Sequence, residues 1–247
     1  LIDHDSPEAL EEMVWATFWK DRYRTDRILP WGVERHAEFR SFFDQHLRKI
    51  IALRSCGACG GTRYMSKNNL NIARTHTLRA LYPDAEIVVP FREPLQHAAS
   101  LLTQHRNFLR IHEEDAFACD YMRAIGHFDF GRNLRPVDFD GWLDHAEERD
   151  PLTLGFWVAY WVATYRHLLG REEDCLVFAS HSRLCEDPEG GLRRLGKAIG
   201  CKDLNALIAA ADRVHTPRHR DVDTGSVPSS LLEEASALYA MLGERAL

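Results

Sequence analysis

Apolar positions recur with helical spacing in several long stretches of the chain. This periodicity predicts amphipathic helices over residues 7–20, from Val33 to Arg54 and over residues 70–81. Residues 152–169 are apolar on nearly every side, which predicts a helix buried in the centre of the protein. A further helix is predicted over residues 188–200, since Asp187 and Pro188 have the form of a helix start and Gly200 of a helix end.

Short, continuous apolar runs predict strands. The runs from Ile87 to Phe91 and from Cys175 to Ala179 are typical of strands buried on both faces, as in a parallel sheet. A third short strand is predicted over residues 62–66. The order strand, helix, strand, helix across residues 62–109 indicates a βαβα unit, with a right-handed crossover and parallel pairing.

A strand-to-helix junction at Arg92 is the strongest candidate for a ligand site. Arg92 ends the strand from Ile87, and Pro94 opens the next helix at the position where its missing N–H costs nothing. The carboxyl ends of strands are where open α/β sheets bind their ligands. The new helix has an apolar side and a polar stripe, and the stripe contains Glu93, His97, Ser100, Gln104 and Asn107. Such a stripe is usually a solvated face, but this one begins beside a strand-end arginine.

Composition narrows the functional classes. A chain of 247 residues suits one large domain over residues 1–247, and a net charge of −6 argues against nucleic acid as a partner. Basic residues nevertheless form two local groups that could bind a small anionic ligand. For the second group, a solvated surface is an equally good explanation. The groups are Arg92, His97, His105, Arg106 and Arg110, and Arg213, His215, Arg218, His219 and Arg220.

The apolar stretches and the cysteines indicate the cellular compartment of the protein. The longest apolar stretch, residues 154–169, is interrupted by polar side chains, so no membrane span is expected, and no signal peptide is recognisable. The six cysteines are too sparse for a disulfide scaffold, which favours reduced thiols in a cytoplasmic protein.

Two segments together resemble a known enzyme family. The first reads Tyr-Pro-Asp-Ala-Glu-Ile-Val-Val-Pro-Phe-Arg-Glu-Pro from Tyr82 to Pro94 and continues to Ser100. The second comprises the apolar run at Cys175, the turn at Asp187 and Pro188, and the helix that ends at Gly200. In this order the two are similar to the sulfotransferases that use 3′-phosphoadenosine 5′-phosphosulfate (PAPS).

The resemblance implies a fold and a ligand. The fold would be a helix-rich, three-layer α/β/α domain with a short parallel sheet, similar to the P-loop nucleotide kinases. Arg92 and Ser100 match the arginine and serine with which the family binds the 3′-phosphate of PAPS. The implied reaction moves the sulfuryl group to a hydroxyl or amine of a small-molecule, glycan or peptide acceptor, and no metal is required. The alternative is that Arg92 pairs with an acid and Ser100 faces water.

The chain departs from the family in its phosphate-binding loop. Sulfotransferases hold the 5′-phosphosulfate in a loop with glycine and paired Thr or Ser residues, between their first strand and a helix. Nothing before residue 50 has that form, and the glycines from Gly57 to Gly61 follow a predicted helix instead of a strand. We expect the loop to lie upstream of Leu1.

Candidate residues for the chemistry itself are less specific. Lys67 leaves the predicted strand 62–66 and could stabilise charge on the transferring group, although an exposed loop lysine explains it equally well. His97, His127 and Asp129 are candidates for the base that activates the acceptor, and His127 is preferred because its loop would cover the acceptor. That loop belongs to residues 111–150, which are polar and rich in turns.

Other interpretations remain open. Cys56 and Cys59 have the spacing of a zinc or redox pair, but without a second pair a simple turn is favoured. A phosphoryl transferase would need a Gly-Lys-Ser/Thr loop, which is not visible. The third interpretation is a catalytically silent sulfotransferase-like protein that binds a nucleotide or serves as an interaction module.

Overall fold

The computed structural model describes residues 11–54, 63–171 and 176–247 and divides the chain into two compact units. The first unit comprises residues 1–84 and 111–137, and the second comprises residues 85–110 and 138–247. Helices dominate both units, and the strands β1 and β2 form a two-stranded parallel sheet in the second. None of the helices in the described ranges is long and apolar enough to cross a membrane.

The first unit is helical and has an aromatic core. Its elements are α1 (Glu12–Phe18), η1 (Lys20–Arg22), α2 (Ala37–Arg54), η2 (Asn69–Ala73), α3 (Thr75–Leu81), α5 (Ala116–Ala124) and η3 (Gly131–Asn133). The Trp15 ring packs 4.3 Å from the ring of Phe39 and 5.2 Å from that of Trp19. These rings supply the large buried apolar surface that fixes α1 against α2.

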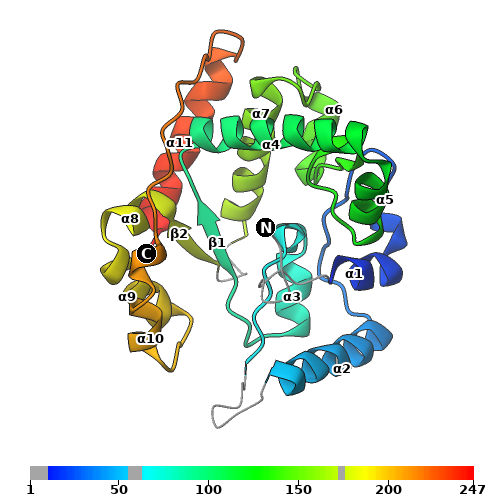
Figure 1. Cartoon of the computed structure of the whole chain (residues 1–247), viewed down its shortest axis with the longest axis vertical. Coiled ribbons are helices and arrows are strands. Elements are labelled where there is room, and N and C mark those ends of the chain that lie inside the picture. The colour runs from blue at the N-terminus through cyan, green and yellow to red at the C-terminus, as the bar shows by residue number, and fades with distance from the viewer. Residues whose placement is uncertain (1–10, 55–62, 172–175) are drawn as a thin grey trace. The chain divides into compact units, whose positions relative to one another are not determined.

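The second unit contains the sheet, with β1 at Val88–Phe91 and β2 at Val177–Ser180 (Figure 1). Its helices are α4 (Pro94–Glu114), η4 (Phe139–Gly141), α6 (Trp142–His145), α7 (Leu154–Leu169), α8 (His181–Glu186), α9 (Pro188–Ala198), α10 (Leu204–Ile208), η6 (Ala211–Arg213) and α11 (Ser229–Arg245). The last residues of α4, from Ile111, are assigned to the first unit.

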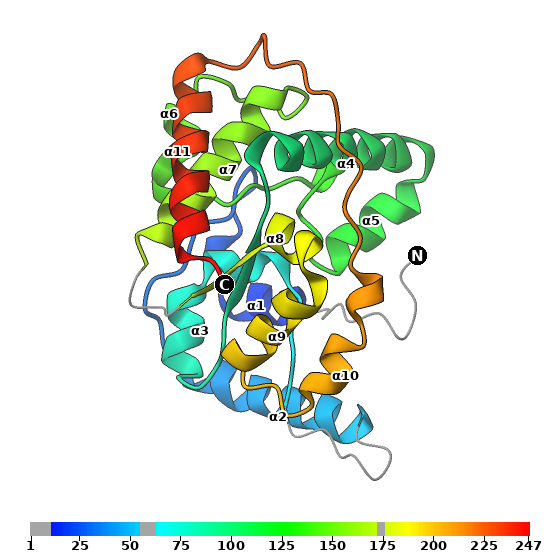
Figure 2. The same ribbon diagram turned by 90° about the vertical axis from the view of Figure 1, so that its left-hand side faces the viewer.

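Helices α7 and α11 pack beside each other and against the sheet (Figure 1). The Tyr165 hydroxyl of α7 donates to the Pro90 carbonyl of β1 at 3.0 Å, and Tyr239 of α11 packs edge-on against Phe91. Figure 2 shows the chain between η6 and α11 as an extended segment that crosses α4. The predicted buried helix is therefore confirmed as α7, and it supports the strand that leads to Arg92.

Other local predictions also agree with the structure. The Asp187 carboxylate caps α9 by accepting from the Gly190 N–H at 3.0 Å, with Pro188 in the first turn. At its other end the Cys201 N–H donates to the Gly196 carbonyl at 2.7 Å, and Gly200 has a positive φ of 61°. Both ends of this helix are thus terminated by the residues that the sequence indicates.

The predicted βαβα unit is wrong. Residues 63–66 form no strand, and the parallel partner of β1 is β2, with Val88 opposite Val177. Tyr64 and Ser66 both donate hydrogen bonds to the Glu11 carboxylate, so side-chain contacts with the start of α1 hold this segment.

Helix boundaries differ from prediction in three further places. The helix predicted over residues 70–81 is divided into η2 and α3, because Arg74 between them leaves helical geometry and pairs with Glu12. Residues 111–150, predicted as polar and rich in turns, contain α5, η3, η4 and α6. Asp115 caps the start of α5, but the polar residues around it gave no clear helix signal. The first helix begins at Glu12, and the proposed earlier start lies outside the described residues.

Candidate functional site

Arg92 and His181 leave the two parallel strands at the same edge of the sheet. Phe91 and Ser180 are paired as the last residues of β1 and β2, and Arg92 and His181 follow them directly. The carboxyl edge of a parallel sheet is the usual ligand position in open α/β folds. The structure therefore adds His181, which the sequence did not single out, to the neighbourhood of Arg92.

Electrostatics connects Arg92 with two imidazoles. Burial, followed by the charges of Arg92 and His181, lowers the pKa of His97 to about 4. Burial and the Arg92 guanidinium likewise lower the pKa of His181. Both rings are therefore neutral near pH 7 beside a permanent cation, and the buried Nδ1 of His97 has no hydrogen-bond partner within the described part of the chain.

The start of α4 is capped by its own acid. The Glu93 carboxylate accepts from the backbone N–H groups of Leu95 and Gln96 at 3.1 Å and 2.7 Å. These N–H groups are the donors with which a free helix start would bind an anion. An anion at this edge would consequently be bound by side chains.

Ser100 is partly exposed on a face of α4 that the extended segment crosses. The Gln96 side chain donates to the Arg220 carbonyl at 2.9 Å and accepts from the Arg220 N–H at 2.8 Å. One turn beyond Ser100, Thr103 Oγ1 lies 3.1 Å from the Arg220 guanidinium. Because Gln96, Ser100 and Thr103 are spaced by four and three residues, they share one helix face. Arg220 thus adds a second guanidinium to this face, and its membership of a basic sequence group was the only signal for it.

A cavity of about 310 Å³ opens beside the strand ends, and its lining includes Phe91, Ser180, Ser182, Arg183 and Tyr239. The Ser182 hydroxyl lies 3.0 Å from that of Ser180 and 3.3 Å from that of Tyr239. The cavity adjoins the last residues of both strands, but its lining includes neither Arg92 nor Ser100.

The first unit brings together three other candidates, Lys67, His127 and Asp129. His127 Nε2 lies 3.6 Å from Asp129 Oδ2, with both side chains about one quarter exposed. Burial and the Glu12 carboxylate raise the pKa of Asp129, while His127, a hydrogen bond from Asn69 and Lys67 act in the opposite direction. An imidazole beside a carboxylate can act as a general base, since the carboxylate orients the ring and stabilises its protonated form.

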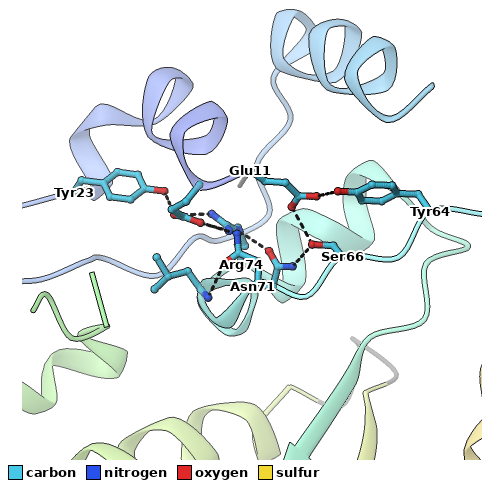
Figure 3. Close-up of polar contacts among 9 residues, drawn as sticks. Glu11, Tyr23, Tyr64, Ser66, Asn71 and Arg74 are labelled. Carbon is cyan, nitrogen blue, oxygen red and sulfur yellow. Dashed lines mark hydrogen bonds and ion pairs between the residues drawn. The ribbon is translucent and has the colours of Figure 1, made fainter. Parts of the chain in front are cut away.

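A buried polar network positions the segment that carries Lys67 (Figure 3). On one side of Lys67, Ser66 donates to Glu11 at 2.9 Å; on the other, Asn68 donates to Glu12 at 2.9 Å. Arg74 then pairs with the same Glu12 carboxylate through its two terminal nitrogens, at 3.1 Å and 2.6 Å. Lys67 itself is an exposed residue, and its neighbours on both sides are hydrogen-bonded to the start of α1.

The four residues predicted for the site are divided between the units. Arg92 and Ser100 belong to the second unit, whereas Lys67 and His127 belong to the first. Within residues 11–54, 63–171 and 176–247, no group of three or more His, Cys, Asp or Glu residues is arranged to hold a metal ion. Cys56 and Cys59 lie outside the described residues.

The sequence and fold were compared with known proteins. No model of a protein family matches the chain, and neither the curated proteins nor the solved structures contain a match to it.

Proposed function

We propose that the chain is a sulfotransferase that moves a sulfuryl group from PAPS to a hydroxyl or amine acceptor. The observation that carries this proposal is that Arg92 directly follows β1, while Ser100 lies on α4 between Gln96 and Thr103, which both contact Arg220. The resemblance of the segments around Tyr82–Ser100 and Cys175–Gly200 to PAPS-dependent enzymes supplies the identity of the ligand.

The charges at this edge suit a phosphate monoester. A guanidinium can donate two parallel hydrogen bonds to phosphate oxygens, and a serine hydroxyl on the next helix can donate a third. His97 and His181 stay neutral beside Arg92, so they add hydrogen-bonding capacity without needing protonation. In this proposal Arg92 and Ser100 bind the 3′-phosphate and Arg220 adds charge beside it.

The remaining roles rest on residues of the first unit. Lys67 would stabilise the negative charge that develops on the transferring group or its bridging oxygen. His127, oriented by Asp129, would take the proton from the attacking hydroxyl or amine. The same proposal includes the three-layer, P-loop-like fold of the enzyme family. It also includes an acceptor that is a small molecule, a glycan or a peptide.

Calorimetry with two nucleotides tests the donor site. We expect wild type to bind 3′-phosphoadenosine 5′-phosphate more tightly than adenosine 5′-phosphate, which lacks the 3′-phosphate. Arg92→Ala should weaken binding of the first nucleotide about ten- to a hundredfold, because a hydrogen bond to a charged group contributes about 1.5–3 kcal/mol. It should leave binding of the second nearly unchanged.

Arg193→Ala is the matched control, since Arg193 is an exposed arginine of α9 in the same unit. Equal affinity of wild type and Arg92→Ala for 3′-phosphoadenosine 5′-phosphate would refute the donor site. Arg92-dependent binding without transfer of labelled sulfuryl groups to any hydroxyl or amine acceptor would favour the catalytically silent alternative. If transfer occurs, Lys67→Ala and His127→Ala should lower its rate while leaving nucleotide affinity intact.

A further inference from the structure

A second cavity, of about 330 Å³, lies between the η4–α6 region, α7 and the start of α11 in the second unit. Its walls include the apolar side chains of Phe139, Trp142, Ala159, Val162 and Leu231. The Trp142 ring is stacked on Tyr160 at 5.3 Å with an interplanar angle of 8°, so the aromatic wall is fixed in orientation. The volume falls at the small end of the range for small-molecule sites, about 300–1,000 Å³.

Charged residues on the lining are mostly acidic. The carboxylates are those of Asp140, Glu147, Glu148 and Glu234, and the only guanidinium among the lining residues is that of Arg166. Arg166 is paired with Glu234, which cancels one carboxylate. His145 also lines the cavity. The cavity therefore combines an aromatic wall with an excess of negative charge.

Two carboxylates remain available to a ligand. Asp140 is engaged by His167, whose Nδ1 lies 3.1 Å from its carboxylate. Glu148 uses Oε1 to accept the Asp150 N–H at 2.8 Å, which leaves its second oxygen. Glu147 is exposed, and within the described part of the chain its carboxylate has no ion-pair partner.

We propose that this cavity binds a small organic cation, a protonated amine attached to an aromatic or other apolar body. The apolar body would fill the space beside Trp142, and the ammonium group would lie toward Glu147 and Glu148. An ammonium group is attracted by nearby carboxylates, whereas a neutral analogue is not attracted in this way and an anionic analogue is repelled. The site is distinct from the Arg92 edge in its residues and opposite in charge, and it does not depend on the proposed sulfotransferase activity.

Calorimetry on the full chain tests the proposal with three probes of one shape. Phenethylamine is cationic at pH 7, phenethyl alcohol is neutral, and hydrocinnamate is anionic. We expect phenethylamine to bind with one molecule per chain and at least about fivefold more tightly than the alcohol, with no binding of the anion. Equal affinity for amine and alcohol, or no binding of the amine at millimolar concentration, would overturn the proposal.

Two variants locate the binding. Glu147→Gln removes a charge from an exposed residue and should weaken phenethylamine about two- to fivefold, as expected for one partly solvated ion pair. Glu186→Gln, at the exposed end of α8, should have no effect. Ala159→Phe fills the cavity and should abolish binding, provided that circular dichroism shows an intact fold. Unchanged affinity in both Glu147→Gln and a folded Ala159→Phe would refute this location.

Discussion

Arg74 and Glu12 form a buried ion pair whose disruption should be costly. The Arg74 side chain is fully buried and Glu12 is 6% exposed, and the guanidinium lies over the rings of Trp15 and Trp31, 4.2 Å and 5.3 Å from their centres. Replacing Arg74 by Met retains most of the volume but leaves the Glu12 carboxylate buried, with Tyr23 and Asn68 as its remaining side-chain donors among the described residues. A buried charge without its partner costs about 3–5 kcal/mol. We expect Arg74→Met to lower the free energy of unfolding by this amount.

The double variant separates the ion pair from simple packing. Glu12→Gln should also cost about 3–5 kcal/mol, because it leaves Arg74 charged and buried. Glu12→Gln combined with Arg74→Met removes both charges and should cost clearly less than the sum of the single changes. A coupling free energy of about 2 kcal/mol or more is expected.

Urea-induced unfolding at pH 7, followed by tryptophan fluorescence and circular dichroism, measures these free energies. Arg123→Met is the control, since the Arg123–Asp120 pair of the same unit is 54% and 68% exposed and should contribute at most about 0.5 kcal/mol. A loss below about 1 kcal/mol for Arg74→Met, or additive single effects, would show that the pair does not stabilise the fold in this way.

The same pair makes stability depend on acid. Burial alone would raise the pKa of Glu12, but the charge and hydrogen bonds of Arg74 outweigh it, so the pKa of Glu12 is below its ordinary value. The stabilisation is therefore present above the unfolded pKa of about 4.3 and is lost as pH falls through the lower folded value. The difference in stability between wild type and Glu12→Gln should shrink below about pH 4; a constant difference would contradict this assignment.

Three further predictions concern single positions. In an NMR titration His97 should titrate near pH 4, and Arg92→Met should raise the pKa of His97. The stabilisation of the fold by the neutral ring should be present above about pH 6.5 and be lost as the pH falls toward 4. A His97 that titrates near 6.5 in wild type would refute the cluster at the sheet edge. Gly126→Ala should cost at least about 2 kcal/mol in urea unfolding, because φ is +80° and the new Cβ would lie 2.7 Å from Glu12 Cβ; a smaller loss would mean that Glu12 has room to move. Asp187→Ala should cost about 1 kcal/mol through loss of the α9 cap, whereas Asp187→Asn, which can also cap a helix, should retain most of the stability.

The sequence by itself determined the features that depend on near neighbours. The strand that ends at Phe91, the helix that starts at Pro94, the buried helix α7 and the capped helix α9 were all predicted from patterns within a few residues. Such signals are reliable because a cap, a proline or an apolar stripe acts within one or two turns. The position of Arg92 at a strand end belongs to this group.

Tertiary structure alone decided which distant segments meet. A short stretch such as residues 63–66 can pair as a strand or donate hydrogen bonds to a buried acid, and the outcome depended on the position of Glu11 beside Tyr64 and Ser66. Parallel pairing of β1 with β2 joins segments far apart in the chain, so no local pattern specifies it.

The candidate site follows the same division. Arg92 and Ser100 could be predicted, because their spacing is set by one strand and one helix. His181 joined them only through the parallel register, and Arg220 only because the Gln96 amide binds its backbone in both directions. Likewise, nothing local marks Arg74 as buried, since an arginine in a helical pattern is ordinarily solvated. Its place was decided by a carboxylate and two indole rings contributed from other parts of the chain, which together stabilise a charge that water would otherwise solvate.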